Sequence, residues 1–154
     1  TSLTATPPFS LGFSGLAAGS VSDSDADAVV TISTNAMAGG AMYIRSANAG
    51  LTSSLASYTI PSATADLAVA SSGYGARVVS ATQSSGGPLT ANAPFNGASD
   101  NVGGLTTNLQ EIASVSAPVT SGVATVRLKA KTTAIMPSAT DYADTLTFIA
   151  AMLF

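Results

Sequence analysis

The amino-acid sequence contains no cysteine and no histidine. The lack of cysteine excludes disulfide bonds, thiol nucleophiles and thiolate metal sites. The lack of histidine excludes a Ser-His-Asp triad and histidine-ligated metals. A Ser-Lys pair would need a desolvated lysine, yet Lys129 and Lys131 both fall on a strand face that the pattern predicts to be solvated. We therefore expect no enzymatic activity, no bound metal and no cofactor.

Charged residues are also scarce. They make up 8% of the 154 residues, against about 25% in ordinary soluble domains. Only five residues are basic and the formal net charge is −3, so the chain lacks the basic patch that nucleic-acid binding requires. Copies with so little charge repel one another weakly, which favours a homopolymer.

Long apolar runs are missing as well. Hydrophobic residues are 46% of the chain, but no run reaches the roughly 18 residues of a membrane span. A composition rich in Ser, Thr, Ala and Gly and poor in Lys and Glu favours an extracellular or cell-surface location. The chain begins at Thr1 without an apolar leader, which we interpret as a signal peptide already removed.

The last segment, Asp141–Phe154, holds the densest group of large apolar residues. Their mixture with β-forming residues predicts a strand. Burying them all would contribute on the order of 10 kcal/mol, so we expect this strand to be a central, buried member of the core. The six residues are Leu146, Phe148, Ile149, Met152, Leu153 and Phe154.

Other segments alternate β-branched and polar residues between turn signals. The clearest are 28–34, 41–46, 75–82, 110–116 and 123–131. About eight short strands without an amphipathic helix predict one all-β domain, a β-sandwich of immunoglobulin-like or jelly-roll-like type.

Two further features concern the surface of this sandwich. In the segment 123–131, Arg127, Lys129 and Lys131 alternate with apolar residues and are predicted to form a solvated basic face. The stretch Gln83–Gly104 is rich in Gly, Pro, Asn and Ser without periodicity, and is predicted to be the longest loop.

The N-terminal residues form a candidate extended arm, residues 1–16, ahead of a sandwich domain, residues 17–154. Phe9, Leu11 and Phe13 alternate with small residues, as in a half-buried strand. Two prolines directly before Phe9 interrupt pairing with anything upstream, such as Leu3.

This alternation has two interpretations. The arm is either the first strand of its own molecule's sheet or a strand that is added to a neighbouring subunit. In the second case Leu3, Phe9, Leu11 and Phe13 are the donor residues, and Leu146, Phe148, Met152 and Phe154 belong to the accepting strand. Donor and acceptor surfaces would then differ, so the contact would propagate head to tail.

Three stretches resemble repeated features of bacterial cell-surface β-sandwich proteins. Many such proteins carry a T-N-A-x-x-G hairpin and close with a Tyr-x-Asp-Thr-Leu/Val-Thr-Phe/Val strand. More specifically, the chain resembles bacterial or archaeal pilus-like filament subunits that assemble by donor-strand complementation, which implies extracellular polymerisation. The stretches are VVTISTNAMAGGAMYIRSANAGLT, YTIPSA and PSATDYADTLTF.

The acidic residues near the last strand are candidates for structural roles. Tyr142 is at the place of a tyrosine corner, in which a phenol hydroxyl bonds back to the backbone. Asp141 and Asp144 flank it, and Glu111 is distant in sequence. A carboxylate pair can perform acid/base chemistry, but this spacing at a strand entrance favours capping of turns.

Asp23, Asp25 and Asp27 are spaced like the opening of a calcium loop. An EF-hand is excluded because its sixth position is Ala28 and its twelfth is Thr34. A looser calcium site and a solvated connector both remain open interpretations.

We thus expect a structural subunit of an extracellular filament, assembled by strand addition between copies. One alternative is a monomeric surface binding module or adhesin that contacts a host or cell surface through Gln83–Gly104. The other is a carbohydrate-active enzyme that uses carboxylates.

Overall fold

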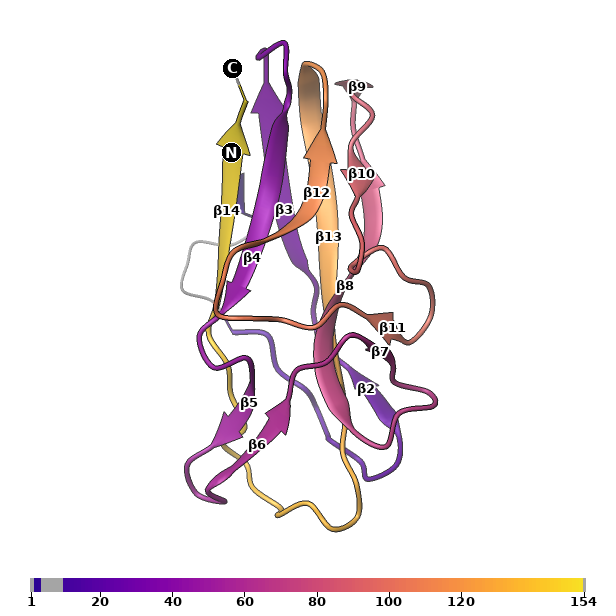
Figure 1. The fold of residues 1–154 in the computed structure, drawn as a ribbon, viewed down its shortest axis with the longest axis vertical. Coiled ribbons are helices and arrows are strands. Elements are labelled where there is room, and N and C mark those ends of the chain that lie inside the picture. Colours follow the sequence, from indigo (N-terminus) through magenta and orange to yellow (C-terminus); the bar gives the residue numbers. More distant parts are fainter. Residues whose placement is uncertain (1, 4–9, 154) are drawn as a thin grey trace.

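The computed structural model describes residues 2–3 and 10–153 of the chain. In these residues every regular element is a β-strand and no helix is present. Two antiparallel sheets run along the length of an elongated molecule (Figure 1). The prediction of an all-β, sandwich-like fold is confirmed.

The larger sheet is organised around its longest strand, β13. Residues of β13 such as Val123 pair with a neighbour on each side, so this strand is central. On one side, β13 (Val119–Lys131) pairs with β3 (Ala28–Thr34) and β2 (Val21–Asp23). On the other side, it pairs with β8 (Gly73–Thr82) and β9 (Ser85–Gly86). The short strand β1 (Ser2–Leu3) pairs with β3.

The smaller sheet has its strands in the order β10, β12, β4, β14. Two short pairs, β5 with β6 and β7 with β11, lie beyond these main sheets. The bounds are β4 (Gly40–Ser46), β5 (Gly50–Ser53), β6 (Tyr58–Pro61), β7 (Ala65–Asp66), β10 (Thr90–Ala91), β11 (Asn101–Val102), β12 (Gln110–Val115) and β14 (Leu146–Met152).

The core lies between the two main sheets. In β3 every second residue is buried, including Val30 and Ile32. These side chains belong to one apolar cluster with Met42 and Ile44 of β4 and with Ile112 of β12. Each such side chain contributes about 1.5–3 kcal/mol when fully buried, so the alternation seen in the sequence produces the sandwich.

The β-rich segments 28–34 and 41–46 and the glycine pair between them predict a hairpin, but this prediction is wrong. β3 pairs with β13, and β4 pairs with β12 and β14, so the turn between β3 and β4 crosses from one main sheet to the other. Gly39 has a φ of 75° in its turn, a conformation that L-residues rarely adopt. A Cβ at this position would lie 1.9 Å from the carbonyl oxygen of Val115. Only glycine therefore fits at this point of the turn.

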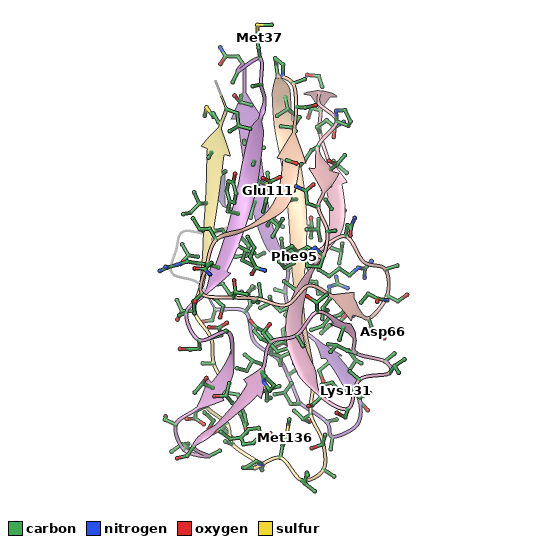
Figure 2. The ribbon with its side chains drawn as sticks, viewed as in Figure 1. Met37, Asp66, Phe95, Glu111, Lys131 and Met136 are labelled. Atoms are coloured by element: carbon green, nitrogen blue, oxygen red, sulfur yellow. The ribbon has the colours of Figure 1, made fainter. Side chains whose placement is uncertain are left out.

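The predicted solvated basic face of β13 is wrong for two of its three residues. Lys129 and Lys131 are buried. The Lys131 Nζ donates to the carbonyl oxygens of Leu67 and Ala68 at 2.9 and 3.1 Å, and Figure 2 places Lys131 in the half of the molecule that contains β7. The segment after β7 covers this face, and sequence alternation cannot reveal such a distant cover.

The segment Gln83–Gly104 is more ordered than the predicted loop. It contains β9, β10 and β11, and it buries Leu89 and Phe95 in the core. The Phe95 ring is so close to Gly103 that a Cβ on residue 103 would lie 2.5 Å from the ring. The apolar side chains therefore anchor a segment whose composition alone indicates a loop.

The expectation of a central, buried C-terminal strand is also wrong. β14 pairs with β4 at the edge of the smaller sheet. Leu146 and Phe148 pack against the core as partly buried residues, whereas Ile149 and Met152 are each 42% exposed. Large apolar residues on both faces of a strand indicate burial, but the order of strands in the sheet places this one at an edge.

We predict that Phe95→Ala lowers the free energy of unfolding by about 3–5 kcal/mol, because it leaves a cavity in the core. Val69→Ala is the control, since Val69 is an exposed residue and its truncation should change stability by no more than about 0.5 kcal/mol. Denaturant unfolding measures both values. Equal effects of the two variants would contradict the packing of this segment.

Candidate subunit interface

The N-terminal arm is joined to its own molecule by a short ladder. Ser2 pairs with Thr31 and Leu3 with Val30 in the antiparallel contact between β1 and β3. A ladder of two residue pairs holds a strand weakly, since each backbone hydrogen bond contributes a net of about 0.5–1.5 kcal/mol. Phe9, another candidate donor residue, lies outside the described residues.

The rest of the arm contacts its own core. Leu11 and Phe13 pack against the apolar cluster as partly buried residues. Residues 10–17 form no strand, so the alternation predicts the side-chain burial but not the element. The Ser14 N–H donates to Asp25 Oδ1, and the Asp25 N–H donates to the carbonyl oxygen of Gly12, both at 2.7 Å. This part of the arm is therefore tied to the connector that follows it.

β14 is an edge strand of the smaller sheet. Among the described residues only β4 pairs with β14, over the seven residues Leu146–Met152. Proteins commonly protect such edges with charged side chains, prolines or bulges. β14 has none of these, and it exposes Ile149 and Met152 in part. Within the described residues, the outer side of β14 is thus an uncharged strand edge without a strand partner.

A groove of about 1190 Å³ adjoins the first half of β14. Its walls come from the arm and from the segment between β13 and β14, and they include Leu11, Phe13, Met136, Leu146 and Phe148. The side chains of accepting-strand residues Leu146 and Phe148 thus line the same space as arm residues. The groove therefore adjoins the start of β14, and its lining combines these apolar side chains with polar ones such as Asp144 and Thr147.

Tyr74 adds a polar group to this groove. The tyrosine is almost entirely buried. Burial, with a smaller effect of the Asp144 carboxylate, raises the pKa of its hydroxyl far above the usual value. The phenol is therefore neutral at ordinary pH and offers the groove a hydrogen-bonding group without charge.

Asp141 caps the turn between β5 and β6. Its Oδ1 accepts a hydrogen bond from the Ser53 hydroxyl, and its Oδ2 accepts from the N–H groups of Ser54 and Leu55 at 3.0 Å. The Ser53 hydroxyl, followed by the Leu55 N–H, lowers the pKa of the Asp141 carboxyl from 3.8 to about 2. The carboxylate is a fixed acceptor for this turn.

Asp144 and Tyr142 complete the attachment of the C-terminal segment. The Asp144 carboxylate accepts from the Ser46 hydroxyl at 2.6 Å and from the Asn48 N–H at 3.2 Å. The Tyr142 hydroxyl donates to the Pro137 carbonyl oxygen at 2.9 Å, as the tyrosine-corner interpretation predicts. The interpretation of the two carboxylates as turn caps is confirmed.

Glu111 is the remaining carboxylate of the catalytic alternative. It lies on β12 (Figure 2) and accepts a hydrogen bond from the Asn92 side chain. Asp141, by contrast, binds the β5–β6 turn. The three carboxylates therefore have separate structural partners.

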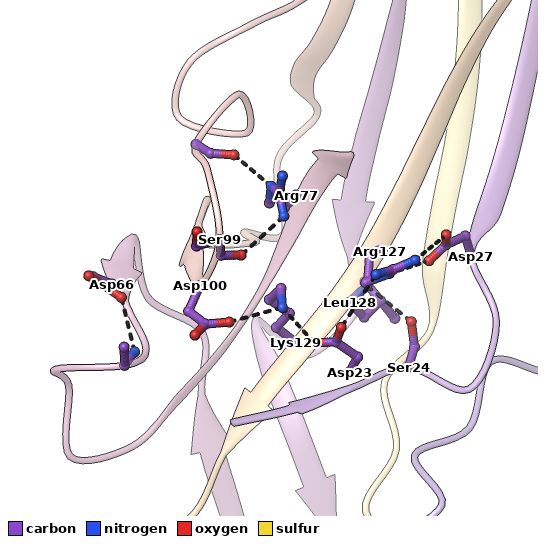
Figure 3. A network of polar contacts seen from close by, with 12 residues as sticks. Asp23, Ser24, Asp27, Asp66, Arg77, Ser99, Asp100, Arg127, Leu128 and Lys129 are labelled. Atoms are coloured by element: carbon purple, nitrogen blue, oxygen red, sulfur yellow. Dashed lines mark hydrogen bonds and ion pairs between the residues drawn. The ribbon is translucent and has the colours of Figure 1, made fainter. Parts of the chain in front are cut away.

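The acidic connector binds basic side chains of β13 (Figure 3). Asp27 accepts from Arg127 at 2.8 Å, and Asp23 accepts from Arg127 at 3.4 Å and from Lys129 at 2.5 Å. Lys129 also contacts Asp100 at 3.0 Å. These carboxylates therefore neutralise cations of the chain itself.

Comparison with protein-family models, curated proteins and solved structures found no match to this chain. Within the part of the chain that the structure describes, no helix has the length and apolar character needed to span a membrane.

We predict that the stability contributed by Asp141 depends on pH. Its folded-state pKa of about 2 lies below the ordinary value of 3.8, so this stabilisation is present above about pH 4 and is lost as the pH falls toward 2. Asp141→Asn should therefore lower Tm most at neutral pH, and the gap from wild type should narrow in acid. Thermal unfolding across this pH range measures the gap, and a constant gap would contradict the assignment.

Proposed function

We propose that this chain is a structural subunit of an extracellular, pilus-like filament whose copies add a strand to one another's sheets. The observation that carries the proposal is the outer edge of β14, which is apolar and uncharged and has no strand partner among the described residues. An added strand would gain backbone hydrogen bonds along this edge, and its alternate side chains would enter the adjoining groove.

The candidate donor is the part of the arm before Pro7. Six residues in an extended conformation span about 20 Å, which is close to the length of β14. Among the described residues, leaving the home molecule breaks the two-pair ladder between β1 and β3, whereas β14 offers seven residues for pairing. Leu11 and Phe13 pack on their own core, so in this proposal they remain at home while the residues before them are donated.

The composition supports assembly outside the cell. Charged residues are 8% of the chain, and the ion pairs of Arg127 and Lys129 neutralise several of them within one molecule. Weak repulsion between copies favours polymerisation. Because the donating and accepting surfaces differ, the contact need not close into a ring and can extend into a fibre.

The second candidate is a monomeric surface binding module or adhesin. The packing of Leu11 and Phe13 on their own core favours it, because a self-contained molecule needs no donated strand. In that case the groove or the Gln83–Gly104 segment would contact the ligand. The carboxylate enzyme has no comparable support, since Asp141 and Asp144 already act as acceptors for turns.

We predict that deletion of residues 1–8 abolishes fibres and leaves the domain folded, because the deletion removes the donor but keeps Leu11 and Phe13. Electron microscopy and size-exclusion chromatography measure assembly, and thermal unfolding confirms the fold. Unchanged fibres would overturn the proposal, and a wild-type chain that stays monomeric at high concentration would favour the adhesin.

A pair of point variants provides a matched control. Adjacent strand residues face opposite ways, so Leu3→Asp and Ser2→Asp place the same charge on opposite faces of the donor. We expect Leu3→Asp to reduce polymer at least about tenfold, since an apolar groove disfavours a carboxylate, and Ser2→Asp to have a much smaller effect. If the two variants reduced the amount of polymer equally, the insertion of Leu3 into the groove would be contradicted.

A further inference from the structure

A buried amine on β13 lies between two carboxylates (Figure 3). The side chain of Lys129 is 7% exposed, and its Nζ lies 2.5 Å from Asp23 Oδ1 and 3.0 Å from Asp100 Oδ1. Asp23 is the last residue of β2, and Asp100 directly precedes β11, so distant parts of the chain meet at this amine. A lysine amine can attack a carbonyl carbon when a neighbouring base removes its proton.

The backbone fixes this arrangement. Lys129 is paired with Asp23 across the β13–β2 ladder, so both side chains lie on the same face of the larger sheet. On its other side Lys129 is paired with Gly75 of β8. A Cβ on residue 75 would lie 2.7 Å from the Gly103 carbonyl oxygen. The glycine therefore leaves room for the segment after Asp100 to pack over this face, which brings the Asp100 carboxylate to the amine.

The Asp23 carboxylate is oriented by a second cation. Its Oδ1 contacts Lys129, while its Oδ2 accepts a hydrogen bond from Arg127 Nη1 at 3.4 Å. The guanidinium is itself held by Asp27, which accepts from Nε and from Nη2, both at 2.8 Å. One oxygen of Asp23 therefore lies beside the amine, and the other lies beside a fixed cation that stabilises negative charge developing there.

We propose that Lys129 and Asp23 condense to an intramolecular isopeptide bond, with Asp100 as the base. Asp100 accepts a proton from the Lys129 ammonium, and the resulting amine attacks Cγ of Asp23. Negative charge on Oδ2 is stabilised by Arg127. Asp100 returns its proton to Oδ1, a second proton passes from Nζ to Oδ1, and Oδ1 leaves as water. The Nζ–Cγ bond replaces the Cγ–Oδ1 bond, Asp100 is again a carboxylate, and no other reactant is consumed.

The fold supplies the driving force that free amines and carboxylates lack in water. Well-oriented intramolecular reactions reach effective concentrations of about 10⁵–10⁸ M, and the β13–β2 ladder holds these two groups in contact. Burial of the Lys129 side chain limits the access of water to the nitrogen, whereas the Asp23 side chain is 41% exposed. The released water therefore has a path to solvent.

The bond would join the base of the N-terminal arm to the central strand of the larger sheet, because β2 is the first strand after the arm and Lys129 belongs to β13. Tension on a donated arm would then reach β13 through a covalent bond. This consequence rests on the proposed filament. The bond itself forms within one chain and does not depend on assembly.

The intact mass of the denatured wild-type protein tests the bond. The proposal predicts that most chains are lighter than the linear sequence by one water molecule, and that a tryptic digest contains one branched peptide with both Asp23 and Lys129. The full linear mass would mean an ion pair only and would overturn the proposal. A water loss confined to a linear peptide, as in an aspartyl succinimide, would overturn it as well.

Two lysine variants form a matched pair. Lys129→Arg keeps the positive charge but removes the attacking amine, so we expect the water loss to disappear. Lys131→Arg changes the next buried lysine of β13, whose Nζ donates to carbonyl oxygens, and the water loss should remain. Its persistence in Lys129→Arg, or its absence from folded Lys131→Arg, would assign the reaction to another site and overturn the proposal.

Two aspartate variants test the base. Asp100→Asn should slow the appearance of the water loss after synthesis by at least about 100-fold, the usual contribution of a general acid or base. Asp66→Asn is the control, since the Asp66 carboxylate accepts from the Ala68 N–H and should leave the rate unchanged. Equal rates for the two variants, measured by mass at successive times, would contradict the role of Asp100.

Deletion of residues 1–8 separates this proposal from the filament, because the shortened chain keeps the reacting side chains. If the deletion abolishes fibres but wild-type chains have the full linear mass, strand addition stands and the bond fails. If the water loss is present but the deletion leaves fibres unchanged, the bond stands and strand addition fails.

Discussion

The hydrogen-bonding groups along the outer edge of β14 impose the main constraint on this fold. A sheet satisfies the backbone groups of every strand except those at its edges. On the side of β8 the larger sheet is covered by further segments, since Ala76 bridges to Gly103 and the Val78 N–H donates to Phe95 at 2.8 Å. No described residue bonds to the outer edge of β14 in this way, so within the described residues the two sides of the sandwich differ, and in the proposed assembly the β14 edge is the one that accepts a strand.

The covered side depends on contacts that join distant parts of the chain. Lys129 joins the connector at Asp23 to the segment at Asp100, and Lys131 binds carbonyl groups that follow β7. Buried cations are tolerated only when such partners surround them. The C-terminal segment is attached in a similar way by Asp141 and Asp144, which accept hydrogen bonds from the β5–β6 turn and from the segment after β4 and so fix the position of β14.

The sequence predicts those features that depend on local patterns. The alternation in Ala28–Thr34 identifies β3 and its buried face, and the glycine pair identifies the turn after it, but not that this turn leads into the other sheet. The environment of Lys129 is not predictable in this way, because its cover comes from residues far along the chain. The edge position of β14 is likewise set by the order of strands, and apolar composition does not encode that order. For the arm residues Leu11 and Phe13, the sequence correctly predicts that they are half-buried. It also predicts that they form a strand, and residues 10–17 form none.

A cryo-electron microscopy reconstruction of the assembled protein tests the central claim most directly. The account predicts an additional strand along the outer edge of β14, about 4.8 Å from it and continuous with the N-terminal residues of the neighbouring subunit. A reconstruction in which this edge is bare, or in which each arm remains paired with its own β3, would contradict the claim.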